Sequence, residues 1–229
     1  MTAAKPNPFL EIAITIVLPG VVLMLLSGAD RLGPAGALVA ALSLPLGWGL
    51  WDGWRRRKVN WLAVVGVAST LLTGGIGLMQ LDARWLAIKE AAVPTLMGLV
   101  IAASAWTRRP LIHALVFDAA LLDTERINTV LAARGSSAAF ETRLRQGTLL
   151  LGAVFLATAV ASYALARWVV ASPAGTEAFN QELGRLTLLS YPLISLPTML
   201  LLMGLLYWLA DGARRLTGLS YGELFRAPH

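Results

Sequence analysis

The chain has 229 residues, of which 57% are hydrophobic and 14% are charged, and its mean hydropathy is +0.67. A soluble domain carries about a quarter charged residues, so this composition excludes an ordinary soluble protein and favours a membrane protein. The absence of cysteine excludes disulfides and thiolate metal sites, and two histidines are too few for a histidine metal cluster.

Six apolar segments are long enough to cross a bilayer. They lie at about residues 9–28, 34–53, 60–80, 85–106, 147–171 and 187–210. The connections on one side carry 14 of the 19 Lys and Arg residues, and the positive-inside rule places that side in the cytoplasm. This asymmetry explains the net charge of +6 without nucleic acid. We expect one all-α, polytopic transmembrane helical bundle over residues 1–229, in a bacterial inner (cytoplasmic) membrane, with both termini cytoplasmic.

The first two spans carry a proline and a charged end. Pro19 lies in the middle of span one and predicts a kink. Spans two and six both end in Asp-Gly-x-Arg-Arg, where arginines three and four residues after the aspartate offset its unfavourable place at a helix C-terminus. The pattern favours either a cytoplasmic charge lock that breaks when the spans rock, or a stop-transfer basic cluster with an incidental ion pair. The residues concerned are Asp52, Arg55, Arg56, Asp211, Arg214 and Arg215.

Span three is rich in small residues at spacings of three and four. They are Gly66, Ser69, Thr73, Gly74 and Gly77. Such a face lets a neighbouring backbone approach closely, so it predicts tight helix packing.

Span four carries Lys89 and Glu90 about one turn inside its outer end, followed by Pro94. Ionisable residues within a span raise a functional question, and the proline ring displaces the carbonyl of Glu90 from the helix ladder. The alternative is that Lys89 snorkels to the headgroups over Trp85 while Glu90 pairs with a neighbouring span. Because adjacent helical residues point about 100° apart, we expect Lys89 and Glu90 each to find its own partner.

Residues 107–146 form the one sizeable cytoplasmic insertion and should hold short helices between spans four and five. Asp123 can cap a helix that Gly135 ends, and from Ser137 a helix can run continuously into span five. Outside the membrane, Thr176 begins a short amphipathic helix that leads into span six.

Span six contains Pro192 and Pro197, which predict a bent helix whose freed carbonyls need partners. Transporter sites are commonly built from interrupted helices near a few polar groups. The candidates for a substrate or proton site are therefore Lys89, Glu90, Pro94, Thr95, Tyr191 and Ser195.

The sequence contains no G-x-x-x-x-G-K-[ST], H-E-x-x-H or dinucleotide glycine pattern, the motifs of P-loop nucleotide-binding proteins, zinc proteases and dinucleotide-binding folds. Glu90 is the only acid well inside a span. We therefore expect no enzyme, no catalytic residue, no metal and no cofactor.

The outer hairpin L-T-G-G-I-G-L-M-Q-L-D-A-R-W-L-A-I-K-E-A-A-V-P-T resembles the Gly-Gly…Leu…Asp…Lys…Pro-Thr hairpin of the intracellular septation protein A family. In that family Lys, Pro and Thr are adjacent, whereas here four residues separate Lys89 from Pro94-Thr95. The chain also resembles uncharacterised bacterial multi-span inner-membrane proteins, some of them labelled as major-facilitator-like permeases. The resemblance covers about residues 45–110 and implies an inner-membrane protein of the cell envelope and no enzyme.

Two functions stay open. Charge inside span four favours permease-like handling of a small, unidentified solute or proton-coupled transport. The lack of a second clear buried charge favours a non-transporting cell-envelope or septation-associated scaffold. The expected partners are the lipid bilayer and, as a homodimer, a second copy that meets the small-residue face of span three or the bent span six.

Overall fold

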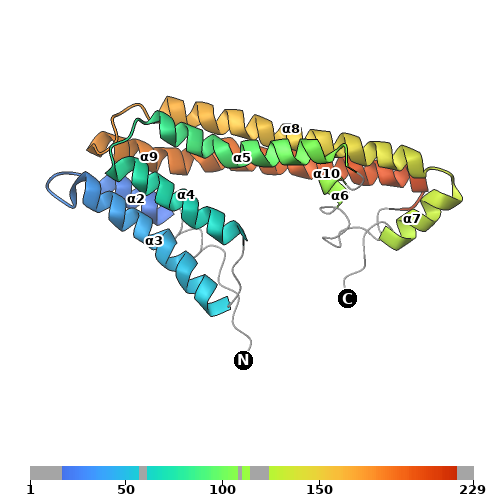
Figure 1. Cartoon of the computed structure of the whole chain (residues 1–229), viewed down its shortest axis with the longest axis horizontal. Helices are drawn as coiled ribbons and strands as arrows, with labels where there is room; N and C mark the ends of the chain where they lie inside the picture. The colour runs from blue at the N-terminus through green and yellow to red at the C-terminus, as the bar shows by residue number, and fades with distance from the viewer. Residues whose placement is uncertain (1–16, 57–60, 108–109, 114–123, 221–229) are drawn as a thin grey trace. The chain divides into compact units, whose positions relative to one another are not determined.

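The computed structural model describes residues 17–56, 61–107, 110–113 and 124–220, and every regular element in those ranges is a helix. The predicted all-α class is therefore confirmed for this part of the chain. The helices are α2 (Leu18–Leu26), α3 (Gly33–Arg56), α4 (Trp61–Leu78), α5 (Arg84–Ser104), α6 (Leu111–His113), α7 (Thr124–Ala133), α8 (Ser137–Val169), α9 (Glu177–Ser190), the π-helix η3 (Tyr191–Ser195) and α10 (Leu196–Thr217) (Figure 1).

Three helices are long and apolar enough to cross a membrane: Arg84–Ser104, Ser137–Val169 and the continuous run Glu177–Thr217. They contain nearly all of the predicted spans four, five and six, which confirms the membrane class. Helices α3 and α4 cover the predicted spans two and three. The predicted span one is described only from residue 17 onward.

Local capping explains where the helices begin and end. Gly135 has a φ of 65° and closes α7, so that α8 begins at Ser137 as predicted. The hydroxyl of Thr176 accepts a hydrogen bond from the Phe179 N–H at 3.1 Å and caps α9, also as predicted. Gly218, in the left-handed region, ends α10. The predicted cap Asp123 lies outside the described residues.

Several helices contain prolines. Pro94 lies inside α5, and Pro45 lies inside α3. The irregularity predicted for span six is the π-helix η3, which contains Pro192 and precedes Pro197 in the first turn of α10. Pro19 lies in the first turn of α2, and residues 9–16 of the span that it was predicted to kink lie outside the described residues.

The chain forms two compact units. The first comprises Met1–Ala91 and Ala161–Ile194, and the second comprises Ala92–Val160 and Ser195–His229. The core of the first includes Leu23, Leu38, Ile76, Leu86, Leu165, Phe179 and Leu183. The core of the second includes Ile101, Ile112, Ile127, Leu131, Phe140, Leu144, Leu151, Leu205 and Leu209.

Glycines mediate the closest helix crossings in the first unit. A Cβ at Gly74 would lie 2.8 Å from the tip of Leu42, and one at Gly77 would overlap Leu38, so the small-residue face of α4 packs on α3. This confirms the tight packing predicted for span three. It also removes Gly74 and Gly77 from the predicted dimer interface, because α3 of the same chain already covers them. The surroundings of Gly66 lie outside the described part of the chain.

In the second unit, α5 crosses α8 at Gly98 and Gly152. A Cβ at Gly152 would lie 2.9 Å from the Ala102 Cβ and 3.0 Å from the Gly98 carbonyl oxygen. Backbone atoms of the two helices therefore touch at this crossing, as is typical of helices that associate within membranes.

Candidate functional site

Lys89 is the centre of a polar cluster between α4 and α5, in the first unit. Its ammonium donates hydrogen bonds to the Thr73 Oγ1 at 2.8 Å and the Ser69 Oγ at 3.2 Å, both on α4. The same nitrogen lies 2.7 Å from Oε1 of Glu90. A lysine ammonium has three N–H donors, so the three acceptors saturate it.

The α4 side of the cluster follows from a four-residue spacing. Ser69 and Thr73 are one turn apart and share a face of the helix. The Thr73 hydroxyl donates its own proton to the Ser69 carbonyl at 3.0 Å, so its oxygen lone pairs are left to accept from Lys89. The local geometry of α4 therefore prepares an acceptor for a cation.

Exposure differs between the two charged groups. The Lys89 side chain is 12% exposed, whereas that of Glu90 is 35% exposed. Within the described part of the chain, only Oε1 of Glu90 is engaged, and its partner is Lys89. A carboxylate has about four lone-pair sites, so Glu90 keeps free capacity to accept a proton or an N–H donor.

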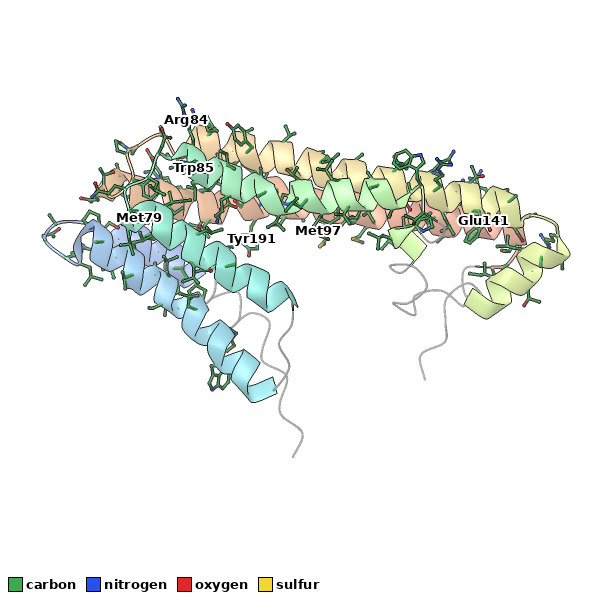
Figure 2. All side chains as sticks on the ribbon, viewed as in Figure 1. Met79, Arg84, Trp85, Met97, Glu141 and Tyr191 are labelled. Carbon is green, nitrogen blue, oxygen red and sulfur yellow. The ribbon has the colours of Figure 1, made fainter. Side chains whose placement is uncertain are left out.

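The prediction that Lys89 and Glu90 do not pair with each other is wrong. Their Cβ atoms point about 100° apart, but both side chains are long enough to bend their ends together. Snorkelling of Lys89 over Trp85 is also not observed, because the ammonium is held on α4 instead. Arg84 and Trp85 are exposed at the beginning of α5 (Figure 2). The expectation that Lys89 finds partners of its own is confirmed.

The other predicted site residues fall in both units. Tyr191, labelled in Figure 2, lies at the start of η3, belongs to the first unit and is 42% exposed. The hydrogen bonds and ion pair of Lys89 given above go to other residues. Pro94, Thr95 and Ser195 belong to the second unit. Pro94 lies inside α5 and has no N–H for the Glu90 carbonyl. The grouping of all six residues stays a prediction.

Ser69 and Thr73 are the residues of the candidate site that sequence reasoning missed, since it assigned them to packing alone. The sequence did contain a signal. The two hydroxyl residues stand four apart in span three, and span four carries Lys89, the one lysine within a span. What the sequence lacked was the direction in which this face of α4 points.

The charge pattern at the end of α10 is the one predicted. Asp211 pairs with Arg215 at 2.7 Å and with Arg214 at 3.4 Å. The related residues of span two, Asp52, Arg55 and Arg56, lie at the end of α3 with side chains outside the described ones. A lock that opens and closes stays a prediction.

Across the described ranges, no group of three or more His, Asp or Glu side chains is placed to hold a metal ion.

Arg143 joins α8 to α10 in the second unit, a contact that sequence reasoning missed. Its Nη2 donates to the Trp208 carbonyl at 2.7 Å, and its guanidinium lies 3.9 Å from the centre of the Trp208 ring. Its Nε is buried without a hydrogen-bond partner among the described residues. The side chain occupies the place that a Cβ at Gly212 would take. The glycine of Asp-Gly-x-Arg-Arg is therefore required by Arg143.

Comparison of the chain with protein-family models, with curated proteins and with solved structures finds no match.

Proposed function

We propose that this chain is a six-span protein of the bacterial inner membrane, with both termini cytoplasmic, that handles a small solute in the manner of a permease. The single observation that carries the proposal is the Lys89–Glu90 pair, which lies about one turn inside a helix long and apolar enough to cross a membrane. Charged side chains are rare in spans and mark pathways for ions, protons or substrates.

The acceptor capacity of Glu90 indicates the sign of the charge that the solute carries. All three N–H donors of Lys89 are engaged and none is left for an anion. One oxygen of Glu90 has no partner among the described residues, and its side chain is 35% exposed. A group that binds at this point therefore brings a proton or a positive charge. Glu90 is the binding group, and Lys89 is its partner at rest.

Pro94 gives the helix a way to rearrange at this point. It cannot donate to the Glu90 carbonyl, so the backbone is weaker beside the carboxylate. Interrupted helices next to polar groups are a common construction of transporter sites. Rearrangement at Pro94 would move Glu90 and release what it binds.

A flux assay tests the function. Wild-type protein is reconstituted into liposomes that hold a pH-sensitive dye, and chloride salts of ammonium, methylammonium, n-propylammonium, sodium and potassium are added in turn. Neutral amines cross the bilayer unaided, so protein-free liposomes set the background. We expect at least one cation to drive proton movement above that background in wild type, and Glu90→Gln, which keeps the shape and removes the charge, to fall to the background. Glu141→Gln, at an exposed carboxylate of α8, is the matched control and should behave as wild type. Equal flux in wild type and Glu90→Gln contradicts the proposal.

Topology is tested separately. Arg57→Cys and Ala178→Cys, in a chain without cysteine, should label from opposite faces of the membrane, because the basic loops are expected in the cytoplasm. Residue 57 lies outside the described residues, and Ala178 is the second residue of α9. Labelling of both from the periplasm would overturn the orientation.

A non-transporting envelope or septation scaffold is the second candidate. The observation that favours it is the saturation of Lys89, since an ion pair with every donor engaged also suits a purely structural role. In that case no cation drives flux in the liposome assay, and Glu90→Gln lowers folding stability without any other effect.

A homodimer remains part of the proposal. With Gly74 and Gly77 covered, the bent span six is the remaining candidate interface, and exposed apolar side chains line α10. They are Leu196, Met199, Leu200, Leu201, Met203 and Tyr207. A detergent-corrected mass of one 24.4 kDa chain, at all concentrations and also in lipid, would remove the dimer.

A further inference from the structure

We infer that Ser69, Thr73 and Glu90 form a receptor for a primary ammonium group, that Lys89 fills this receptor at rest, and that the solute carries the same group. This inference rests on the proposed function for its reference to a solute. The receptor itself is argued from the contacts of the first unit alone.

The number and kind of acceptors match a primary ammonium. Three oxygens surround the Lys89 nitrogen, at 2.7 Å from Glu90, 2.8 Å from Thr73 and 3.2 Å from Ser69. A primary ammonium has three N–H donors to meet them, whereas a quaternary ammonium has none. These distances are typical of N–H···O hydrogen bonds. They are longer than the distances of about 2.0–2.6 Å between magnesium or calcium ions and their oxygen ligands.

Lys89 acts as a tethered competitor for this receptor. A ligand on a short flexible link has an effective concentration on the order of millimolar, so a free amine must displace it. The displaced ammonium has a place to go: Arg84 begins α5 five residues earlier, about 7.5 Å along the helix. A lysine stem can turn its charge toward the headgroups over such a distance. Lys89 then alternates between the receptor and the outer interface and gates access to Glu90.

The test uses Lys89→Ala in the full chain, purified in detergent. This substitution removes Cγ, Cδ, Cε and Nζ, and n-propylammonium supplies three carbons and one ammonium in their place. We expect n-propylammonium to bind Lys89→Ala at least about tenfold more tightly than wild type, since the tethered competitor is gone. Binding is measured by calorimetry and by the rise of the unfolding temperature.

Three controls identify the contacts. Tetramethylammonium has the same charge without N–H donors and should not bind Lys89→Ala. 1-Propanol has the same length without the charge and should bind more weakly. The double variant Lys89→Ala/Glu90→Gln should lose the binding of n-propylammonium. Lys89→Met fills the space with an uncharged chain and should bind no amine.

Each outcome decides the inference. Equal binding of n-propylammonium and tetramethylammonium, or binding that survives Glu90→Gln, overturns the receptor. If Lys89→Ala is recovered unfolded, n-propylammonium present during purification must restore the folded chain, and a failure to do so also overturns it. Binding without any flux in liposomes leaves the receptor standing and removes the proposed transport. If flux requires Glu90 but no amine binds to Lys89→Ala, the proposed transport stands and the receptor is overturned.

Discussion

Thr73 in the first unit and Thr158 in the second make the same local contact and serve different purposes. Each hydroxyl donates its proton to the carbonyl four residues back, at 3.0 Å to Ser69 and at 2.9 Å to Val154. Each oxygen is then left to accept from a facing helix. Thr73 accepts from the Lys89 ammonium, whereas Thr158 lies 3.0 Å from the Thr198 hydroxyl. The facing helix, not the threonine, decides whether the contact belongs to a charged site or to plain helix packing.

Lys89 and Arg143, both partly buried, differ in the same way. Lys89 is held by side-chain oxygens that another ammonium can use, and one of them is a carboxylate. Arg143 is held by the Trp208 carbonyl and ring and fills the space over Gly212. An arginine fixed in this manner has no equivalent exchange partner. The proposed solute site therefore lies in the first unit, and we regard Arg143 as a clamp between α8 and α10.

The largest expected effect concerns the crossing of α5 and α8 in the second unit, and it tests whether the packing there is rigid. Gly152→Leu should destabilise the fold by about 3 kcal/mol, since its Cβ would press on the Gly98 carbonyl and the Ala102 backbone, which cannot turn away. Gly77→Leu should destabilise less, because the atom in its way is the end of the flexible Leu38 side chain. The measurement is the free energy of unfolding in an SDS titration.

Gly204 supplies the control for both variants, because nothing lies within 4 Å of a Cβ placed there. Gly204→Leu should leave stability unchanged or raise it by up to about 1 kcal/mol, the usual difference in helix propensity from glycine. Equal losses at Gly152 and Gly77 would show that the two crossings do not differ.

Thr73→Val should cost about 1.5–3 kcal/mol, the range for a hydrogen bond to a charged group. The change keeps the shape and removes the acceptor on which Lys89 depends. It should also weaken the binding of n-propylammonium to Lys89→Ala, which a purely structural contact would not do. Unfolding in SDS and calorimetry measure the two effects, and an unchanged amine affinity would count against Thr73 as part of the receptor.

Pro94→Ala should slow cation flux several-fold while leaving stability unchanged or raised, because alanine restores the helix N–H beside Glu90. Pro45→Ala makes the same repair inside α3, away from the charged pair, and should leave flux as in wild type. Stopped-flow rates in liposomes compare the two. If both prolines affect flux alike, the break at Pro94 has no special role.

Much of the fold could be predicted because its signals are local. The start of α8 at Ser137 follows from Gly135, and the start of α9 follows from the Thr176 cap; both depend on a few adjacent residues. Length and apolar composition sufficed for the three helices that are long and apolar enough to cross a membrane. The ion pairs of Asp211 were predictable because three- and four-residue spacings place their partners on one helix face.

The site contacts could not be predicted because they depend on which helix faces meet. The contact of Lys89 with α4 requires the direction of the Ser69 and Thr73 face, which no spacing within α5 contains. The 100° rule fixed the Cβ directions of Lys89 and Glu90 but ignored the reach of their side chains, so the prediction against their pairing failed. Arg143 was counted only as a topology charge, and its place over Gly212 requires α8 and α10 together.

The smallest expected effect gives the sharpest form of the comparison. Thr158→Val makes the same substitution as Thr73→Val, at a hydroxyl in the same local geometry, and removes a contact with a neutral partner instead of a charged one. Hydrogen bonds between membrane helices average about 0.6 kcal/mol, so Thr158→Val should lower the free energy of unfolding by about that amount. Cation flux and amine binding should be unchanged. A loss as large as that of Thr73→Val would mean that the charge of Lys89 adds nothing to its contact with α4, and the distinction between the two units would fall.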